Sequence, residues 1–208
     1  MTTIPDNGTL FPENIDRLFT NCRMATMAGG RYSIIESAAL AVAGGKIAWI
    51  GPMDALPYPL PGSIERTDCQ NRWILPGFVD CHTHLIWAGS RAKEFEMRLA
   101  GASYADIANA GGGIVSTVKA TRAASEDTLF ELASRRMAHF LTQGITTVEI
   151  KSGYGLDLDT ELKMLAVAGR LKQIVAQQIE VTFLGAHAVP PEFAGNSDAY
   201  IREITQVM

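Results

Sequence analysis

The chain has 208 residues, of which 47% are hydrophobic and 19% are charged, and its formal net charge is −4. This composition is typical of a globular protein and excludes a largely disordered one. A weakly acidic chain offers no broad cationic surface, so we expect a small-molecule partner and neither nucleic acid nor a membrane. Three cysteines without C-x-x-C spacing, and an N-terminus without a basic region and apolar run, predict a cytoplasmic protein with free thiols.

Short apolar runs predict strands in the first part of the chain, at residues 17–22, 38–42 and 46–50. Gly44 and Gly45 separate the last two runs and favour a hairpin, because both glycines can adopt positive φ. We therefore expect a small β-domain over residues 1–74, followed by a different domain over residues 75–208.

The second part alternates strands and helices. Ser125 is a plausible N-cap, and a helix is expected from there to Gly144. Its apolar face is predicted to hold Leu129, Leu132, Ala133, Met137 and Phe140. A second helix is expected over residues 160–176, with Leu162, Leu165 and Ala166 on one stripe. Strands at 145–150 and 179–185 complete a βα pattern, which predicts a parallel sheet covered by helices.

Two histidines end the apolar, strand-like stretch 75–85. Side chains alternate along a strand, so His82 and His84 should share one face with Asp80. Neutral imidazole is a common ligand of divalent ions such as zinc, and catalytic sites usually supply about three protein ligands. The spacing favours a metal site that needs further ligands. The alternative is that both histidines are ordinary polar residues at a strand end.

Stretch 75–85 resembles the first barrel strand of the amidohydrolase superfamily. Together with stretches 87–95, 148–157 and 183–191, it resembles the imidazolonepropionase family of that superfamily, over the N-terminal half of a family member. The resemblance implies an α/β fold: a metal-dependent hydrolase (β/α)8 TIM-like barrel, of which only about the first three strands are present, preceded by part of a small β-sandwich. Residues 1–74 would be the β-sandwich part and residues 75–208 the N-terminal portion of the barrel.

The resemblance also implies a reaction of histidine degradation, the metal-dependent hydrolysis of the ring C–N amide bond of 4-imidazolone-5-propanoate to N-formimidoyl-L-glutamate. His82 and His84 would bind one divalent metal ion, zinc or iron. Arg91 would bind the substrate carboxylate, for which its planar fork is suited. His187 would be catalytic and contact the substrate carbonyl, and Tyr154 and Tyr104 would also line the substrate pocket.

Each of these residues has an alternative role. Arg91 could form a surface ion pair with Glu94 or Glu96, and Tyr154 could be a turn tyrosine at the barrel rim. His187 could be a hydrogen-bonded core histidine, and for Tyr104 core packing is an equally good interpretation. Glu149 and Lys151 are interpreted as structural polar residues, and His139 as helix surface.

A complete barrel takes about 250 residues, so three strands indicate a truncated chain that we expect to be inactive alone. The remaining metal ligands and the general base would lie beyond Met208, and the full-length protein would be a homodimer. Two other functions stay open. The chain could come from another amidohydrolase, such as a cyclic amidase or a guanine or cytosine deaminase, or it could be a non-catalytic fragment.

Overall fold

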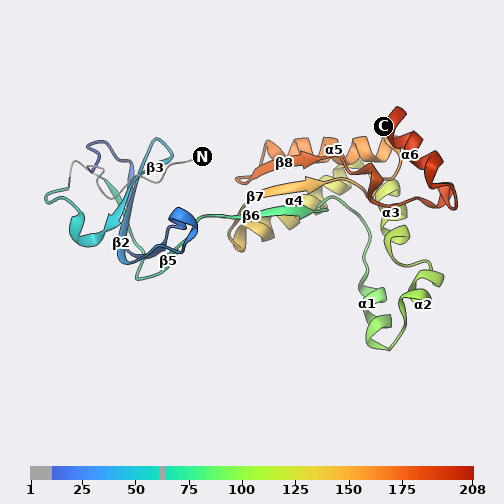
Figure 1. The fold of residues 1–208 in the computed structure, drawn as a ribbon, viewed down its shortest axis with the longest axis horizontal. Coiled ribbons are helices and arrows are strands. Elements are labelled where there is room, and N and C mark those ends of the chain that lie inside the picture. The colour runs from blue at the N-terminus through green and yellow to red at the C-terminus, as the bar shows by residue number, and fades with distance from the viewer. Residues whose placement is uncertain (1–10, 61–63) are drawn as a thin grey trace. The chain divides into compact units, whose positions relative to one another are not determined.

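The computed structural model describes residues 11–60 and 64–208. The chain divides into two compact units, Met1–Pro76 and Gly77–Met208, which are described separately. Figure 1 shows the elements of each unit along the chain.

The first unit contains one five-stranded sheet in the order β3-β2-β1-β4, with β5 also paired to β1. Its strands are β1 (Arg17–Ala25), β2 (Ile34–Ala43), β3 (Lys46–Pro52), β4 (Glu65–Asp68) and β5 (Trp73–Ile74). Strands β2 and β3 form the antiparallel hairpin expected across Gly44 and Gly45, whose φ angles are 55° and 74°. Two short helical turns, η1 (Ala28–Gly30) and η2 (Met53–Ala55), lie between strands.

The second unit is built on a parallel sheet in the order β6-β7-β8, made of β6 (Phe78–Thr83), β7 (Ile145–Lys151) and β8 (Gln178–Thr182). Helices α4 (Glu126–Thr142) and α5 (Leu158–Lys172) lie along this sheet (Figure 1). Val148 and Ile150 of β7 pack with buried residues of both helices in one core. The predicted α/β class is therefore confirmed.

The remaining helices precede α4 or follow β8. They are α1 (Ala92–Leu99), α2 (Tyr104–Asn109), α3 (Ile114–Ala123) and α6 (Ser197–Gln206), with the short turns η3 (Gly185–His187) and η4 (Pro191–Phe193). Across the described ranges, none of the helices combines the length and apolar character that crossing a membrane requires.

Helix α4 agrees closely with its sequence pattern. The Ser125 hydroxyl accepts a hydrogen bond from the Thr128 N–H, as an N-cap should. Leu129, Ala133 and Met137 are buried, and the helix stops before Gly144, which has a φ of 80°.

The predicted stripe of α5 was wrong. Leu162 is 54% exposed and Ala166 is also exposed. The buried face carries instead Thr160, Glu161, Met164, Val167, Ala168 and Leu171. The prediction assumed that the leucines of α5 mark its buried face. The buried face instead includes the carboxylate of Glu161, and hydrogen bonds allow this polar group to lie in the interior. The helix also begins and ends earlier than residues 160–176, and β8 ends at Thr182 rather than at Gly185.

Candidate active site

Three aromatic side chains meet at the carboxyl-terminal edge of the parallel sheet. His84 follows β6, Tyr154 follows β7, and His187 lies in η3 after β8. Ring centroids are 4.2 Å apart for His84 and His187, 5.0 Å for His84 and Tyr154, and 5.5 Å for Tyr154 and His187. Parallel strands place their carboxyl ends at one edge, so residues between 33 and 103 positions apart form one group. We call this group the His84–Tyr154–His187 cluster.

His84 is held in an environment that suits a metal ligand. Both of its ring nitrogens, Nδ1 and Nε2, are buried and have no hydrogen-bond partner among the residues that the structure describes. Burial, followed by the proximity of His187, lowers the pKa of His84 to about 4. The imidazole is therefore neutral near neutral pH, and its lone pair is available. Buried polar atoms are normally paired, so these two nitrogens indicate a missing partner.

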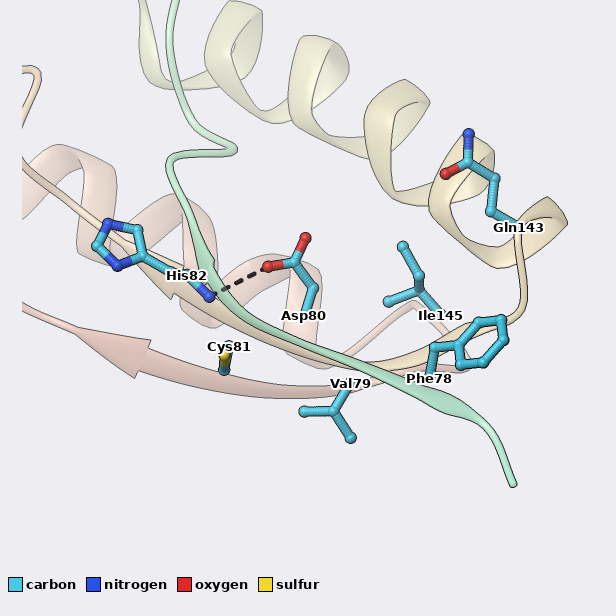
Figure 2. Close-up of a pocket in the computed structure, with 7 residues that line it drawn as sticks. All are labelled: Phe78, Val79, Asp80, Cys81, His82, Gln143 and Ile145. Atoms are coloured by element: carbon cyan, nitrogen blue, oxygen red, sulfur yellow. Dashed lines mark hydrogen bonds between the residues drawn. The ribbon is translucent and has the colours of Figure 1, made fainter. Parts of the chain in front are cut away.

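His82 lies at the end of edge strand β6 and is exposed. Its ring centroid is 5.7 Å from that of His84. Figure 2 shows the open pocket along this strand, with the side chains of Val79 and Cys81 on the side opposite Asp80, and the His82 N–H donating to Asp80 Oδ1 at 3.1 Å. Among the described residues, no group of three or more His, Cys, Asp or Glu side chains is arranged to hold a metal ion.

Arg91 lies just before α1 and is anchored by one hydrogen bond. Its Nε–H donates to the hydroxyl of Thr117 on α3, at 3.0 Å. Within the described part of the chain it forms no ion pair, and Glu94 instead accepts a hydrogen bond from Ser116 at 3.0 Å. The Arg91–Glu94 alternative is therefore not what the structure contains.

Tyr104 is separate from the cluster. It begins α2, its side chain is 72% exposed, and it has no ring contact with the three clustered side chains. The structure thus does not bring it to His84.

The face of β7 opposite the helices carries charge. Glu149 forms an ion pair with Lys151 and accepts a hydrogen bond from the Thr182 hydroxyl at 2.5 Å. The hydrogen bond from Lys151, and next that from Thr182, lower the pKa of Glu149. This arrangement adds a side-chain link to the backbone pairing of β7 with β8.

Two loops carry Tyr154 and His187, and buried polar residues tie these loops together. The Ser152 hydroxyl accepts a hydrogen bond from the Leu184 N–H at 2.9 Å, and the Ser152 N–H donates to Thr182 O at 3.0 Å. Tyr200 of α6 donates its phenol proton to Gly185 O at 2.6 Å. These residues, and Glu161, were missed by sequence reasoning, because a serine, a tyrosine or a helical glutamate has no motif that distinguishes it from a surface residue.

Comparison with solved structures identifies the fold. A triazine hydrolase from Arthobacter aurescens matches with a TM-score of 0.53 at 18% identity, covering 82% of this chain and 36% of the hydrolase. A 5-methylcytosine deaminase from Klebsiella pneumoniae matches with a TM-score of 0.53 at 19% identity, covering 80% of this chain and 35% of the deaminase. An atrazine chlorohydrolase from Arthrobacter aurescens, complexed with zinc, matches with a TM-score of 0.50 at 17% identity, covering 80% of this chain and 35% of the chlorohydrolase. These neighbours are amidohydrolase-superfamily members, and the chain shares the fold of the matched part of each.

The sequence is more specific. Imidazolonepropionases of Pseudomonas putida, Pseudomonas aeruginosa and Brucella anthropi are 53%, 52% and 50% identical to the chain over 192, 193 and 199 residues. The matches cover 92%, 92% and 95% of this chain. Over the matched residues the chain is about half identical to these imidazolonepropionases, which confirms the resemblance predicted from four motifs. No family model matches it. The chain spans about half the length of the curated relatives, 47% to 49%.

Proposed function

We propose that this chain is the N-terminal portion of an imidazolonepropionase, which hydrolyses the ring C–N amide bond of 4-imidazolone-5-propanoate to N-formimidoyl-L-glutamate. The observation that carries the proposal is the identity of about 50% to imidazolonepropionases across nearly the whole chain. The His84–Tyr154–His187 cluster supports it, since it unites three of the predicted site residues at the strand ends, where barrel enzymes place their chemistry. On this proposal, residues 75–208 belong to a (β/α)8 barrel and residues 1–74 to a β-sandwich.

The residues fit a divalent metal ion, zinc or iron. The two unpartnered, buried ring nitrogens of His84 are the kind of donor that such an ion needs, and His82 lies next to them. A structural neighbour solved with zinc agrees with this assignment. When bound, such an ion acts as a Lewis acid and lowers the pKa of water. His82 and His84 fall short of the usual three protein ligands, so further ligands must come from outside the described residues.

The organic part of the substrate would contact Arg91, Tyr154 and His187. The Nε–H of Arg91 is engaged by Thr117, so the guanidinium is oriented while its terminal N–H groups remain for a carboxylate. Burial lowers the pKa of His187, so its ring is neutral and can donate one hydrogen bond to an oxygen on which charge develops. The Tyr154 ring lies edge-on to His187 and would limit where the substrate ring sits. Tyr104 would join the pocket only if α2 moved.

A chimera tests the proposal. This chain would replace its matched segment in the Pseudomonas putida imidazolonepropionase, and hydrolysis of 4-imidazolone-5-propanoate would be measured. We expect turnover by the chimera and none by the isolated chain, which supplies two metal-binding histidines. Arg91→Ala in the chimera should raise KM about 10-fold or more, because a charged hydrogen-bond partner is lost, and should leave the metal content unchanged.

Arg98→Ala is the matched control, since Arg98 is an exposed arginine of α1, the helix that begins directly after Arg91. It should leave KM unchanged. A folded chimera that hydrolyses only 5-methylcytosine or a triazine would favour another amidohydrolase, and turnover by the isolated chain would contradict the expected need for further ligands. Loss of metal in Arg91→Ala would contradict the role given to Arg91.

A further inference from the structure

We propose that Glu161 is a positioning residue that fixes the positions of Tyr154 and His187, which contact the substrate. This inference rests on the proposed function. Glu161 lies in the first turn of α5 and is 1% exposed. Its carboxylate accepts three backbone hydrogen bonds: Oε2 from the Gly153 N–H at 2.9 Å, and Oε1 from the Gly155 and Leu156 N–H groups at 2.8 Å each. These donors flank Tyr154 on both sides.

The loop that Glu161 binds has a backbone that needs support. Gly153 has a φ of 111°, and Leu156, which is not a glycine, has a φ of 58°. A left-handed conformation is strained for a non-glycine residue, so surrounding contacts must maintain it. Three amides that point at one carboxylate provide such contacts. They also hold the Leu156 side chain in the interior, where it is 2% exposed.

The position of this loop determines the position of His187. A Cβ atom built on Gly153 would lie 2.7 Å from the Cβ of His187 and 2.8 Å from Leu184 O. The backbone of the loop therefore touches the histidine directly, with no side chain between them. Since Tyr154 follows Gly153 in the same loop, any shift of the loop moves both substrate-contacting residues together.

Glu161 serves this loop rather than the substrate. Its carboxylate is buried and accepts hydrogen bonds from three backbone N–H groups of the loop. Glu161 therefore acts on the substrate through Tyr154 and His187. Within the described residues it has no ion-pair partner. A buried carboxylate is costly unless hydrogen bonds satisfy it, and an apolar side chain would complete the α5 core more simply. The carboxylate instead fixes the geometry of the loop.

The experiment compares Glu161→Gln with Asp159→Asn in the chimera described above. Glutamine keeps the size of the side chain but turns an N–H₂ group toward amide donors, so at least one hydrogen bond to the loop is lost. Asp159 is an exposed acid of the same helical turn, so Asp159→Asn removes equal charge without touching the loop. We expect Glu161→Gln to lower kcat/KM by roughly 100-fold, mainly through KM, while Asp159→Asn leaves it unchanged. Metal content and folded fraction should not change.

A second measurement does not depend on activity. In the 208-residue chain, amide hydrogen exchange should accelerate at Gly153, Gly155 and Leu156 in Glu161→Gln, and stay unchanged in α4. Gly153→Ala is a second variant, useful if Glu161→Gln does not fold. Its new Cβ presses on His187 while Glu161 stays in place, so it should raise KM in the same way.

Three outcomes overturn the proposal. They are unchanged amide exchange in Glu161→Gln, a KM equal to that of Asp159→Asn, and a fall in kcat that tracks the folded fraction at constant KM, which would indicate a purely structural role. Absence of turnover in the chimera with native Glu161 would refute the proposed function itself, so the two failures are distinguishable.

Discussion

The guanidinium of Arg136 lies over the indole ring of Trp87, with its central carbon 3.7 Å from the ring centroid. The same arginine donates from Nη1 to Leu85 O at 2.8 Å and to Trp87 O at 2.9 Å. Arg136 belongs to α4, whereas Leu85 and Trp87 belong to the segment that directly follows His84. One side chain therefore fixes the backbone that follows β6 and His84.

Arg136→Lys should destabilise the chain by about 1–2 kcal/mol, because lysine keeps the charge but loses the planar fork and its stacking on Trp87. Urea unfolding followed by circular dichroism would measure the loss. Arg135→Lys is the matched control, since Arg135 is an exposed neighbour on the same helix, and it should change the unfolding free energy by less than about 0.5 kcal/mol. Equal effects of the two variants would contradict the role given to Arg136.

Tyr200 should make stability depend on alkaline pH. Burial raises the pKa of its phenol from 10.0 to about 12 in the folded chain. The folded state therefore binds the proton more tightly than the unfolded state does. Its contribution to stability is fully present below pH 10.0 and is lost as the pH rises toward about 12.

Unfolding free energies of the native chain and of Tyr200→Phe, measured across that range, would test this. The native chain should be more stable by about 1 kcal/mol at neutral pH, through the hydrogen bond to Gly185 O, and the difference should shrink above pH 10.0. Tyr32 is 70% exposed, so Tyr32→Phe should show no such trend. A difference that is constant with pH would argue against a buried phenol.

His84→Leu should stabilise the metal-free chain by roughly 1–2 kcal/mol, because two buried ring nitrogens without partners are replaced by an apolar side chain. The same variant should abolish any rise in melting temperature on adding zinc, since a ligand stabilises only the state that binds it. His139 is exposed on α4, so His139→Leu should retain the zinc response. A zinc response that survives in His84→Leu would exclude His84 as a ligand.

The three cysteines should differ in reactivity. Cys81 is exposed, Cys69 is intermediate, and Cys22 is buried. Burial, and next the proximity of Cys69, raises the pKa of the Cys22 thiol to about 11. Only the thiolate attacks alkylating reagents, so maleimide labelling should modify Cys81 first and Cys22 last, as read by peptide mass spectrometry. Early labelling of Cys22 would mean that the first unit opens readily.

The spacing of apolar residues predicted the buried face of a helix correctly where the buried residues are themselves apolar. The stripe of α4 was correct because its buried positions Leu129, Ala133 and Met137 are all apolar. The stripe of α5 was wrong because Glu161 and Thr160 occupy buried positions while Leu162 faces outward. A pattern of apolar residues cannot reveal a buried carboxylate, whose burial depends on amides that fold back from a preceding loop.

The sequence by itself determined the α/β class, the alternation of helices and strands from α4 to β8, and the histidines that end the first parallel strand, because these depend on local periodicity and short motifs. Only the tertiary structure decided that His84, Tyr154 and His187 come together, that Thr117 orients Arg91, and that Glu161 holds the Tyr154 loop. Such contacts join residues that are between 5 and 103 positions apart in the chain. Hydrogen bonds and burial act through space, so no local pattern encodes which of these partners meet.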